Sequence, residues 1–210
     1  MAVTLVADPK NVKLASDDRI ERTMKALEAN NIHAILAENS ADAKKMLLEL
    51  IPANVEVFTA SSVTLNSLGI NEELDKSGRY NSIRAKLGAM DPKTQGREMQ
   101  KMGATPEYMI GSVQAVTETG CVIVASKTGS QIAGYVSGAA HVIWVVGSQK
   151  IVSTLAEGCK RVEEIALPLE NARALKAFGV GSSINKLLII YREFKPGRTT
   201  MIVVKEPLGF

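Results

Sequence analysis

Short apolar runs alternate with amphipathic segments in the first sixty residues. Ser16 and the two aspartates that follow it predict a helix start, because a hydroxyl can cap free amides and carboxylates complement the positive end of a helix. From there the pattern predicts a helix ending at Asn30-Asn31, the strand Ile32–Ala37, a helix capped by Ser40 and stopped by Pro52, and a strand over residues 55–59. Such alternation is typical of βαβ units, whose right-handed crossovers give a parallel sheet with helices on both faces.

The middle of the chain, residues 61–103, is more polar and shows no strand pattern. A short helix is expected to end at Gly69, a second to cover residues 83–87, and a third to begin at Asp91-Pro92 and close at Gly103. We interpret this segment as a helical insertion.

Three apolar runs in the second half predict buried strands: Tyr108–Gly111 and residues 121–126 and 142–146. Continuous apolar runs indicate burial on both faces, so these are the expected central strands. Residues 153–167 predict a helix that Pro168 breaks, and residues 170–178 predict a further helix that Gly179 ends.

The last forty residues predict two strands, residues 187–192 and 199–205, around the turn Lys195-Pro196-Gly197-Arg198. This turn has the chemistry of a β-hairpin, so an antiparallel pair is expected to close the sheet. The 210 residues fit one α/β domain with a mostly parallel sheet, a helix-rich N-terminal half and a C-terminal hairpin.

Composition narrows the function classes. Hydrophobic residues make up 46% and charged residues 22%, as in globular proteins, and the net charge of +3 is too small for a nucleic-acid binder. The start of the chain does not read as a signal peptide, and residues 132–147 are too short and too rich in glycine for a membrane span. We expect a cytoplasmic protein, a homo-oligomer such as a dimer, and a small anionic ligand.

The sequence contains few residues that could ligate a metal ion or an iron–sulfur cluster. Cys121 and Cys159 lie far apart and match no CxxC spacing, so no iron–sulfur cluster is expected from this chain alone. His33 and His141 form no HxH or HExxH motif, so no metal site is predicted. His141 opens a predicted strand, where a structural role is commoner than a catalytic one.

A polar segment lies between two of the apolar strands, with Glu118 at its centre. A carboxylate at a strand end could act as nucleophile, general base or hydrogen-bond acceptor, because open α/β sheets bind ligands in the crevice at such ends. The alternative is that Glu118 only caps a surface turn. The candidate residues here are Glu118 as catalytic group and Gln114, Thr117, Thr119 and Gly120 as ligand contacts.

Two further polar corners follow predicted strands. A glycine-containing turn with hydroxyls and a lysine could cradle an anion, although neither a P-loop nor GxGxxG is present; an ordinary capped loop is the alternative. The segment Gly147-Ser148-Gln149-Lys150 is a weaker corner of the same type, which would complete the crevice. The candidate ligand contacts here are Thr128, Gly129, Ser130, Gln131 and Gly147.

These segments resemble the LUD domain, the lactate-utilisation family with LutC- and YkgG-like members. The resemblance rests on residues 111–120, the Thr128-Gly129-Ser130-Gln131 loop, the segment 141–147 and the ending 185–210, and it is closest to standalone LUD proteins. It implies a three-layer α/β/α fold like that of NagB, ribose-phosphate isomerase A and class I CoA transferases. Glu118 with Gly120 is similar in position to the acyl-accepting glutamate of CoA transferases, with Thr119 inserted between the two.

The resemblance leads to two functional hypotheses. LutC-type members are implicated in oxidising lactate to pyruvate within an assembly whose iron–sulfur clusters belong to partner subunits, which implies a ligand-binding or accessory role for this chain. The alternative is an independent enzyme that uses Glu118 on a phosphorylated, CoA-linked or nucleotide-like anion.

Overall fold

A computed structural model describes residues 13–210 and contains a six-stranded sheet in the order β1-β10-β7-β4-β2-β3. Every neighbouring pair in this main sheet is parallel. The strands are β1 (Ile32–Ala37), β2 (Glu56–Thr59), β3 (Asn81–Ser82), β4 (Tyr108–Gly111), β7 (His141–Gly147) and β10 (Thr199–Val204). Parallel strands direct their carboxyl ends to one edge, and that edge positions the candidate site.

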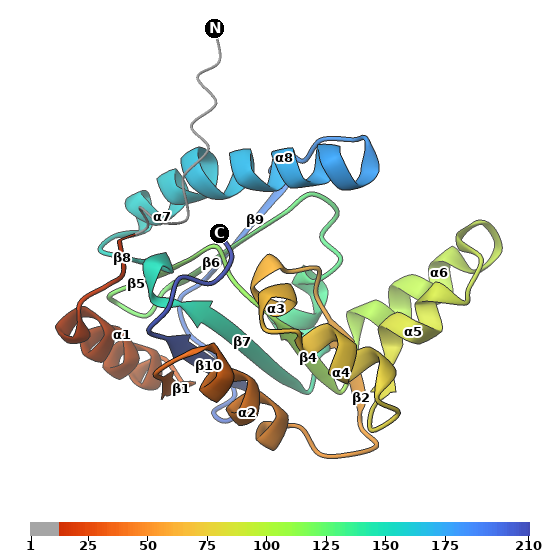
Figure 1. Cartoon of the computed structure of the whole chain (residues 1–210), viewed down its shortest axis with the longest axis horizontal. Coiled ribbons are helices and arrows are strands. Elements are labelled where there is room, and N and C mark those ends of the chain that lie inside the picture. Colours follow the sequence, from red (N-terminus) through yellow and green to blue (C-terminus); the bar gives the residue numbers. More distant parts are fainter. Residues whose placement is uncertain (1–12) are drawn as a thin grey trace, which may run out of the picture.

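Helices α2 (Ser40–Leu50), α3 (Val63–Ser67) and α4 (Ile70–Lys76) cover one face of the main sheet (Figure 1). Their apolar sides pack on residues such as Ile143 and Ile202, which lie at alternate positions of β7 and β10. The N-cap of α2 is Asn39, whose side chain accepts a hydrogen bond from the Asp42 amide at 2.9 Å, so the predicted cap at Ser40 lies one residue too late.

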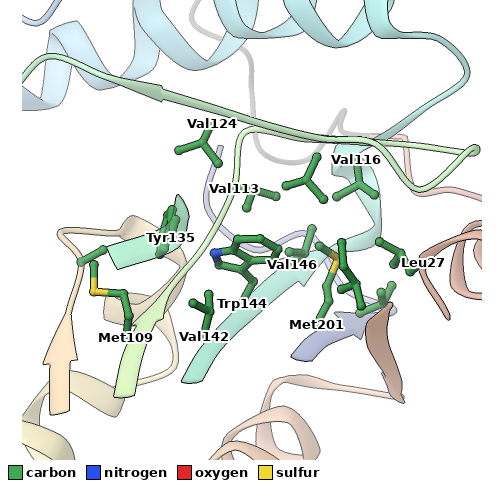
Figure 2. Close-up of a cluster of buried hydrophobic side chains, with 14 of the residues drawn as sticks. Leu27, Met109, Val113, Val116, Val124, Tyr135, Val142, Trp144, Val146 and Met201 are labelled. Atoms are coloured by element: carbon green, nitrogen blue, oxygen red, sulfur yellow. The ribbon is translucent and has the colours of Figure 1, made fainter. Parts of the chain in front are cut away.

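A second, four-stranded sheet lies on the other face, in the order β8-β5-β6-β9. Figure 2 shows Val113, Val116 and Val124 from this side of the core facing Trp144 and Met201 of the main sheet. The strands are β5 (Ala115–Thr117), β6 (Val122–Ser126), β8 (Ile151–Val152) and β9 (Lys186–Ile190), and α1 (Asp17–Ala29) packs beside them in the same layer.

Behind the second sheet runs a long helical segment of three consecutive parts. They are α7 (Leu155–Arg161), the π-helical η4 (Val162–Ala166) and α8 (Leu167–Phe178). Pro168 does not break this segment as predicted: the helical backbone continues through it, directly after the π-helical η4. The mixed α/β fold with a mostly parallel central sheet is confirmed, and the second sheet adds a fourth layer to the expected three.

Each strand predicted in the second half exists at about the expected residues, but β5 and β8 were not predicted and the pairing differs from the expectation. The two C-terminal strands form no hairpin: β9 pairs antiparallel with β6, whereas β10 inserts in parallel between β1 and β7. The predicted strand over residues 121–126 corresponds to β6, which belongs to the second sheet and not to the centre of the main one.

The segment 61–103 is largely helical, as expected. Beside α3 and α4 it contains α5 (Ile83–Gly88) and α6 (Pro92–Ala104), and it also contributes the two-residue strand β3 at the sheet edge. Helix α6 begins at Pro92, with the Asp91 side chain accepting a hydrogen bond from the Lys93 amide at 2.9 Å. Between residues 13 and 210, no helix is both long and apolar enough to cross a bilayer.

Candidate functional site: a polar cavity at the strand ends

A cavity of about 240 Å³ lies where β2, β4 and β7 end. These three strands are neighbours in the main sheet, and the residues that follow each of them, Ser61, Ser112 and Lys150, line the cavity. The loop after β6 and the segment around Ser183 form the opposite wall. The site therefore occupies the crevice in which open α/β sheets bind ligands.

Lys150 is the most unusual residue of this cavity, because its side chain is 1% exposed. Its Nζ donates hydrogen bonds to Thr64 Oγ1 at 3.0 Å and to Ser112 Oγ at 3.1 Å. None of the ion pairs formed within residues 13–210 includes Lys150. Burial, together with the nearby guanidinium of Arg161, lowers the pKa of Lys150 well below its usual value.

A second buried cation stands behind the cavity wall. Arg161 is 8% exposed and donates a hydrogen bond to the carbonyl oxygen of Gln114, and burial lowers its pKa to about 10. The one acidic side chain among the cavity-lining residues, Glu170, is held by two nitrogens of Arg173, Nε and Nη2, each at 2.7 Å. Within residues 13–210, Lys150 therefore has no side-chain carboxylate as a partner, which favours an anionic ligand.

Four of the predicted contacts line the cavity: Thr128, Ser130 and Gln131 from the loop after β6, and Gln114 from the segment between β4 and β5. Several of their polar groups already have partners. Gln114 Oε1 accepts from the Ala125 amide at 2.9 Å, and Gln131 Oε1 accepts from Ser126 Oγ at 3.0 Å. The hydroxyls of Thr128 and Ser130 make only long bonds within the loop, at 3.3 and 3.4 Å, and a hydroxyl can rotate to donate to a ligand instead.

Gly129 supports this loop without lining the cavity. Its φ of +87° is strained for other residues, and a Cβ atom there would lie 2.8 Å from Cδ of Lys186. Gly147 also lies outside the lining residues. A Cβ at Gly147 would lie 2.6 Å from the amide nitrogen of Leu208, so this glycine admits the C-terminal segment beside β7.

Glu118 lies elsewhere, in the turn between β5 and β6, and does not line the cavity. Its carboxylate accepts hydrogen bonds from Arg19 Nε at 2.7 Å and from Arg22 Nη2 at 2.9 Å, both on α1. Hydrogen bonds from Arg22 and Arg19 lower its pKa, which is the reverse of what a general acid or base near neutral pH requires. This geometry pairs Glu118 with two arginines of α1 outside the cavity, and the catalytic role expected for it stays a prediction.

The neighbours of Glu118 serve the same contact with α1. Thr117 and Thr119 bond to each other through their hydroxyls at 2.8 Å, and the Thr119 carbonyl accepts from Asn30 Nδ2 at 3.0 Å. Gly120 has a φ of +77°, and a Cβ there would lie 2.8 Å from the backbone of Ala26. None of these residues lines the cavity.

The described residues do not suit a metal or an iron–sulfur cluster. Residues 13–210 contain no group of three or more histidine, cysteine, aspartate or glutamate side chains that could hold a metal ion. Cys121 is buried and Cys159 is half-buried, and two thiols are too few for a cluster. His141 stacks on Tyr108 with ring centroids 4.6 Å apart, which is a structural contact.

Sequence reasoning missed the residues that give the cavity its charge, Lys150 and Arg161, and the hydroxyls of Thr64 and Ser112. The sequence did contain a signal for two of them. Lys150 closes the corner noted after β7, and Ser112 directly follows β4. No local signal marked Thr64, which lies in α3 far earlier in the sequence, or Arg161, which ends α7, the first α-helix after that corner.

Comparison with known proteins agrees with this architecture. A crystal structure of a DUF162 family protein from Deinococcus radiodurans is similar, with a TM-score of 0.54 and 13% identity over 91% of this chain and 99% of that chain. At this identity the likeness concerns the fold alone. None of the curated proteins compared matches the chain. The LUD domain model matches residues 20–204, so the chain belongs to the LUD domain family.

Proposed function

We propose that the chain binds a small organic acid anion in the cavity over Lys150, as a ligand-binding component of organic-acid utilisation. The observation that carries this proposal is a buried lysine that contacts two hydroxyls and no carboxylate. Burial without a counter-ion disfavours the charged form of Lys150, and an anion that enters the cavity supplies the counter-charge with which the amine can take up a proton.

The size and lining of the cavity support a small ligand. About 240 Å³ is below the range of typical drug-sized sites, and serine and threonine hydroxyls dominate the polar lining. Such hydroxyls can donate to a carboxylate or to a ligand hydroxyl. A compact 2-hydroxy or 2-oxo acid fits these features better than a nucleotide or a CoA ester.

The link to lactate oxidation comes from the family. LUD proteins are associated with lactate utilisation, and the two-cysteine content of this chain suits a subunit that depends on iron–sulfur partners for electron transfer. We therefore include redox partner subunits in the proposal. The alternative enzyme that uses Glu118 lacks geometric support, because that carboxylate is engaged by α1 outside the cavity.

Calorimetric titration of the purified protein with lactate, pyruvate and inorganic phosphate tests this function. The Lys150→Met variant removes the amine and keeps a long apolar stem, so we expect organic-acid affinity to fall by roughly tenfold to a hundredfold, the usual worth of a hydrogen bond to a charged group. Lys93→Met removes an equal charge from an exposed position on α6 and should leave affinity unchanged.

Two results would contradict the proposal. One is that none of the three anions gives a heat of binding or raises the melting temperature, even at concentrations far above those in cells. The other is equal binding by the wild type and Lys150→Met, which would place the anion away from the cavity.

A further inference from the structure

We propose that the amine of Lys150 condenses with the carbonyl group of a 2-oxo acid bound in the cavity, forming a reversible Schiff base. This inference rests on the proposed function and names the substrate class of the same site. It concerns the reactivity of Lys150 and not only its charge.

The surroundings of Lys150 Nζ suit a nucleophile. An ordinary lysine has a pKa of about 10.4, so at pH 7 fewer than about one molecule in a thousand carries a free lone pair. Burial and the Arg161 guanidinium lower the pKa of Lys150, which increases that neutral fraction. Desolvation beside another cation is a known way to activate a lysine for attack on carbonyl carbon.

The hydroxyls at the amine can carry the protons that the reaction moves. Attack by Nζ forms an N–C bond while the carbonyl oxygen takes up a proton and becomes a hydroxyl, which gives a carbinolamine. Loss of that hydroxyl as water, with a second proton from nitrogen, leaves the C=N bond. Thr64 Oγ1 and Ser112 Oγ lie 3.0 and 3.1 Å from Nζ, and each can both donate and accept. The condensation requires no oxidant or reductant.

The charge balance of the cavity selects an acid over a plain ketone. A protonated imine would carry a positive charge into a site where Lys150 contacts hydroxyls only and Glu170 is bound to Arg173. A carboxylate on the carbon next to the imine provides the counter-ion within the ligand itself. A 2-oxo acid combines both groups in a molecule small enough for the cavity.

Borohydride trapping tests the imine directly. The whole protein is incubated with pyruvate, reduced with sodium borohydride and mapped by peptide mass spectrometry. We expect one adduct, with the mass of pyruvate less one water plus two hydrogens, on the peptide that contains Lys150. Labelling there should exceed that at any other lysine by roughly tenfold or more, as its larger neutral fraction requires. Lactate, which has no carbonyl carbon to attack, should give none.

Variants separate reactivity from charge. Lys150→Arg keeps a long basic side chain but forms no stable imine, so it should lose the adduct, whereas Lys93→Met removes an exposed lysine on α6, outside the cavity, and should keep it. If either variant fails to fold, the peptide map of the wild type still shows whether Lys150 carries the adduct.

The outcomes distinguish this inference from the function on which it rests. Trapping spread over surface lysines, or no trapping while calorimetry records pyruvate binding, would overturn the Schiff base and leave anion binding intact. Absence of any anion binding would overturn the proposed function itself.

Discussion

At the scale of single residues, the amine of Lys150 leaves water on folding and gains only two neutral hydroxyls. Removing an amine from water without a carboxylate partner costs free energy, and the fold must supply it from packing elsewhere. A position that is unfavourable for stability and central to a cavity is typical of a functional residue, because stability and activity often conflict at such sites.

The cost of desolvating the Lys150 amine leads to a prediction about stability. We expect Lys150→Met to raise the free energy of unfolding by about 1 kcal/mol at neutral pH, because the thioether stem fills similar space without an amine to desolvate. Urea unfolding of both proteins measures the difference. A Lys150→Met protein less stable than the wild type would mean that the bonds to Thr64 and Ser112 outweigh the desolvation cost.

The same difference should depend on pH. The pKa of Lys150 is lower in the folded protein than the 10.5 of the free side chain, so above pH 10.5 the amine is neutral in both states. As the pH falls below that value, Lys150 becomes protonated in the unfolded chain but stays neutral in the folded protein. The free energy of unfolding of the wild type therefore decreases. The advantage of Lys150→Met should therefore grow from about pH 10 down to pH 7. A constant difference would show that Lys150 is charged in the folded state.

At the scale of elements, Arg198 organises the π-helix η2 (Gly134–Gly138). Its guanidinium donates to the carbonyl oxygens of Gly134 at 2.8 Å, Tyr135 at 3.1 Å and Ala139 at 3.0 Å, and it pairs with Glu193 at 2.6 Å. Burial acts to raise the pKa of Glu193, but bonds from Thr199 and Arg198 lower it overall. This network lies at the start of β10 and holds η2, whose Tyr135 also lines the cavity.

Loss of that network should be costly. Arg198→Met removes the buried cation that pairs with Glu193 and takes one donor from each of three carbonyls, so we expect a loss of about 3 kcal/mol in the free energy of unfolding. Arg192→Met removes an exposed arginine six positions earlier and should change stability by less than about 0.5 kcal/mol. Thermal melts of the two variants measure this contrast, and similar midpoints would refute the assigned role of Arg198.

The local sequence pattern predicted where strands form, but not which strands pair. The run 142–146 was predicted as a strand because it is continuously apolar, and residues 199–205 because they flank a turn, and both are strands in the structure. Their partners were not predictable in this way, since β10 pairs with β1 across more than 160 residues of chain. The turn at Pro196-Gly197 has the residues of a hairpin turn, yet the strands before and after it, β9 and β10, belong to different sheets. Directly after the turn, the buried side chain of Arg198 donates to the Gly134 carbonyl of η2.

At the scale of the whole molecule, the site assembles where three layers meet. Polar residues after strands pointed to the crevice, so Thr128, Ser130 and Gln131 were identified from sequence. The burial of Lys150 was not, because it depends on Thr64, 86 positions away, and on Ser112, 38 positions away. Glu118 was predicted as a site residue because it lies between apolar strands. Its pairing with Arg19 and Arg22 could not be predicted from the local sequence, because these arginines lie nearly one hundred positions earlier.

The turn around Glu118 joins the second sheet to α1, and this contact offers the last prediction. Glu118→Gln removes the charge that holds Arg19 and Arg22, so we expect a loss of about 1 kcal/mol in the free energy of unfolding, the upper range for partly exposed pairs. The pKa of Glu118 is lowered in the folded protein, so this stabilisation is complete above the ordinary value of 4.5 and disappears as the pH falls through the folded value.

The wild type and Glu118→Gln should therefore converge in stability on acidification, in unfolding experiments across that range. Glu72→Gln, which breaks an exposed pair with Lys76, should have a smaller effect. Pyruvate binding and trapping at Lys150 should be unchanged in Glu118→Gln, because residue 118 does not line the cavity. If that variant instead kept its stability and lost ligand binding, the carboxylate would belong to the functional site, and the division between a structural turn and a binding cavity would be wrong.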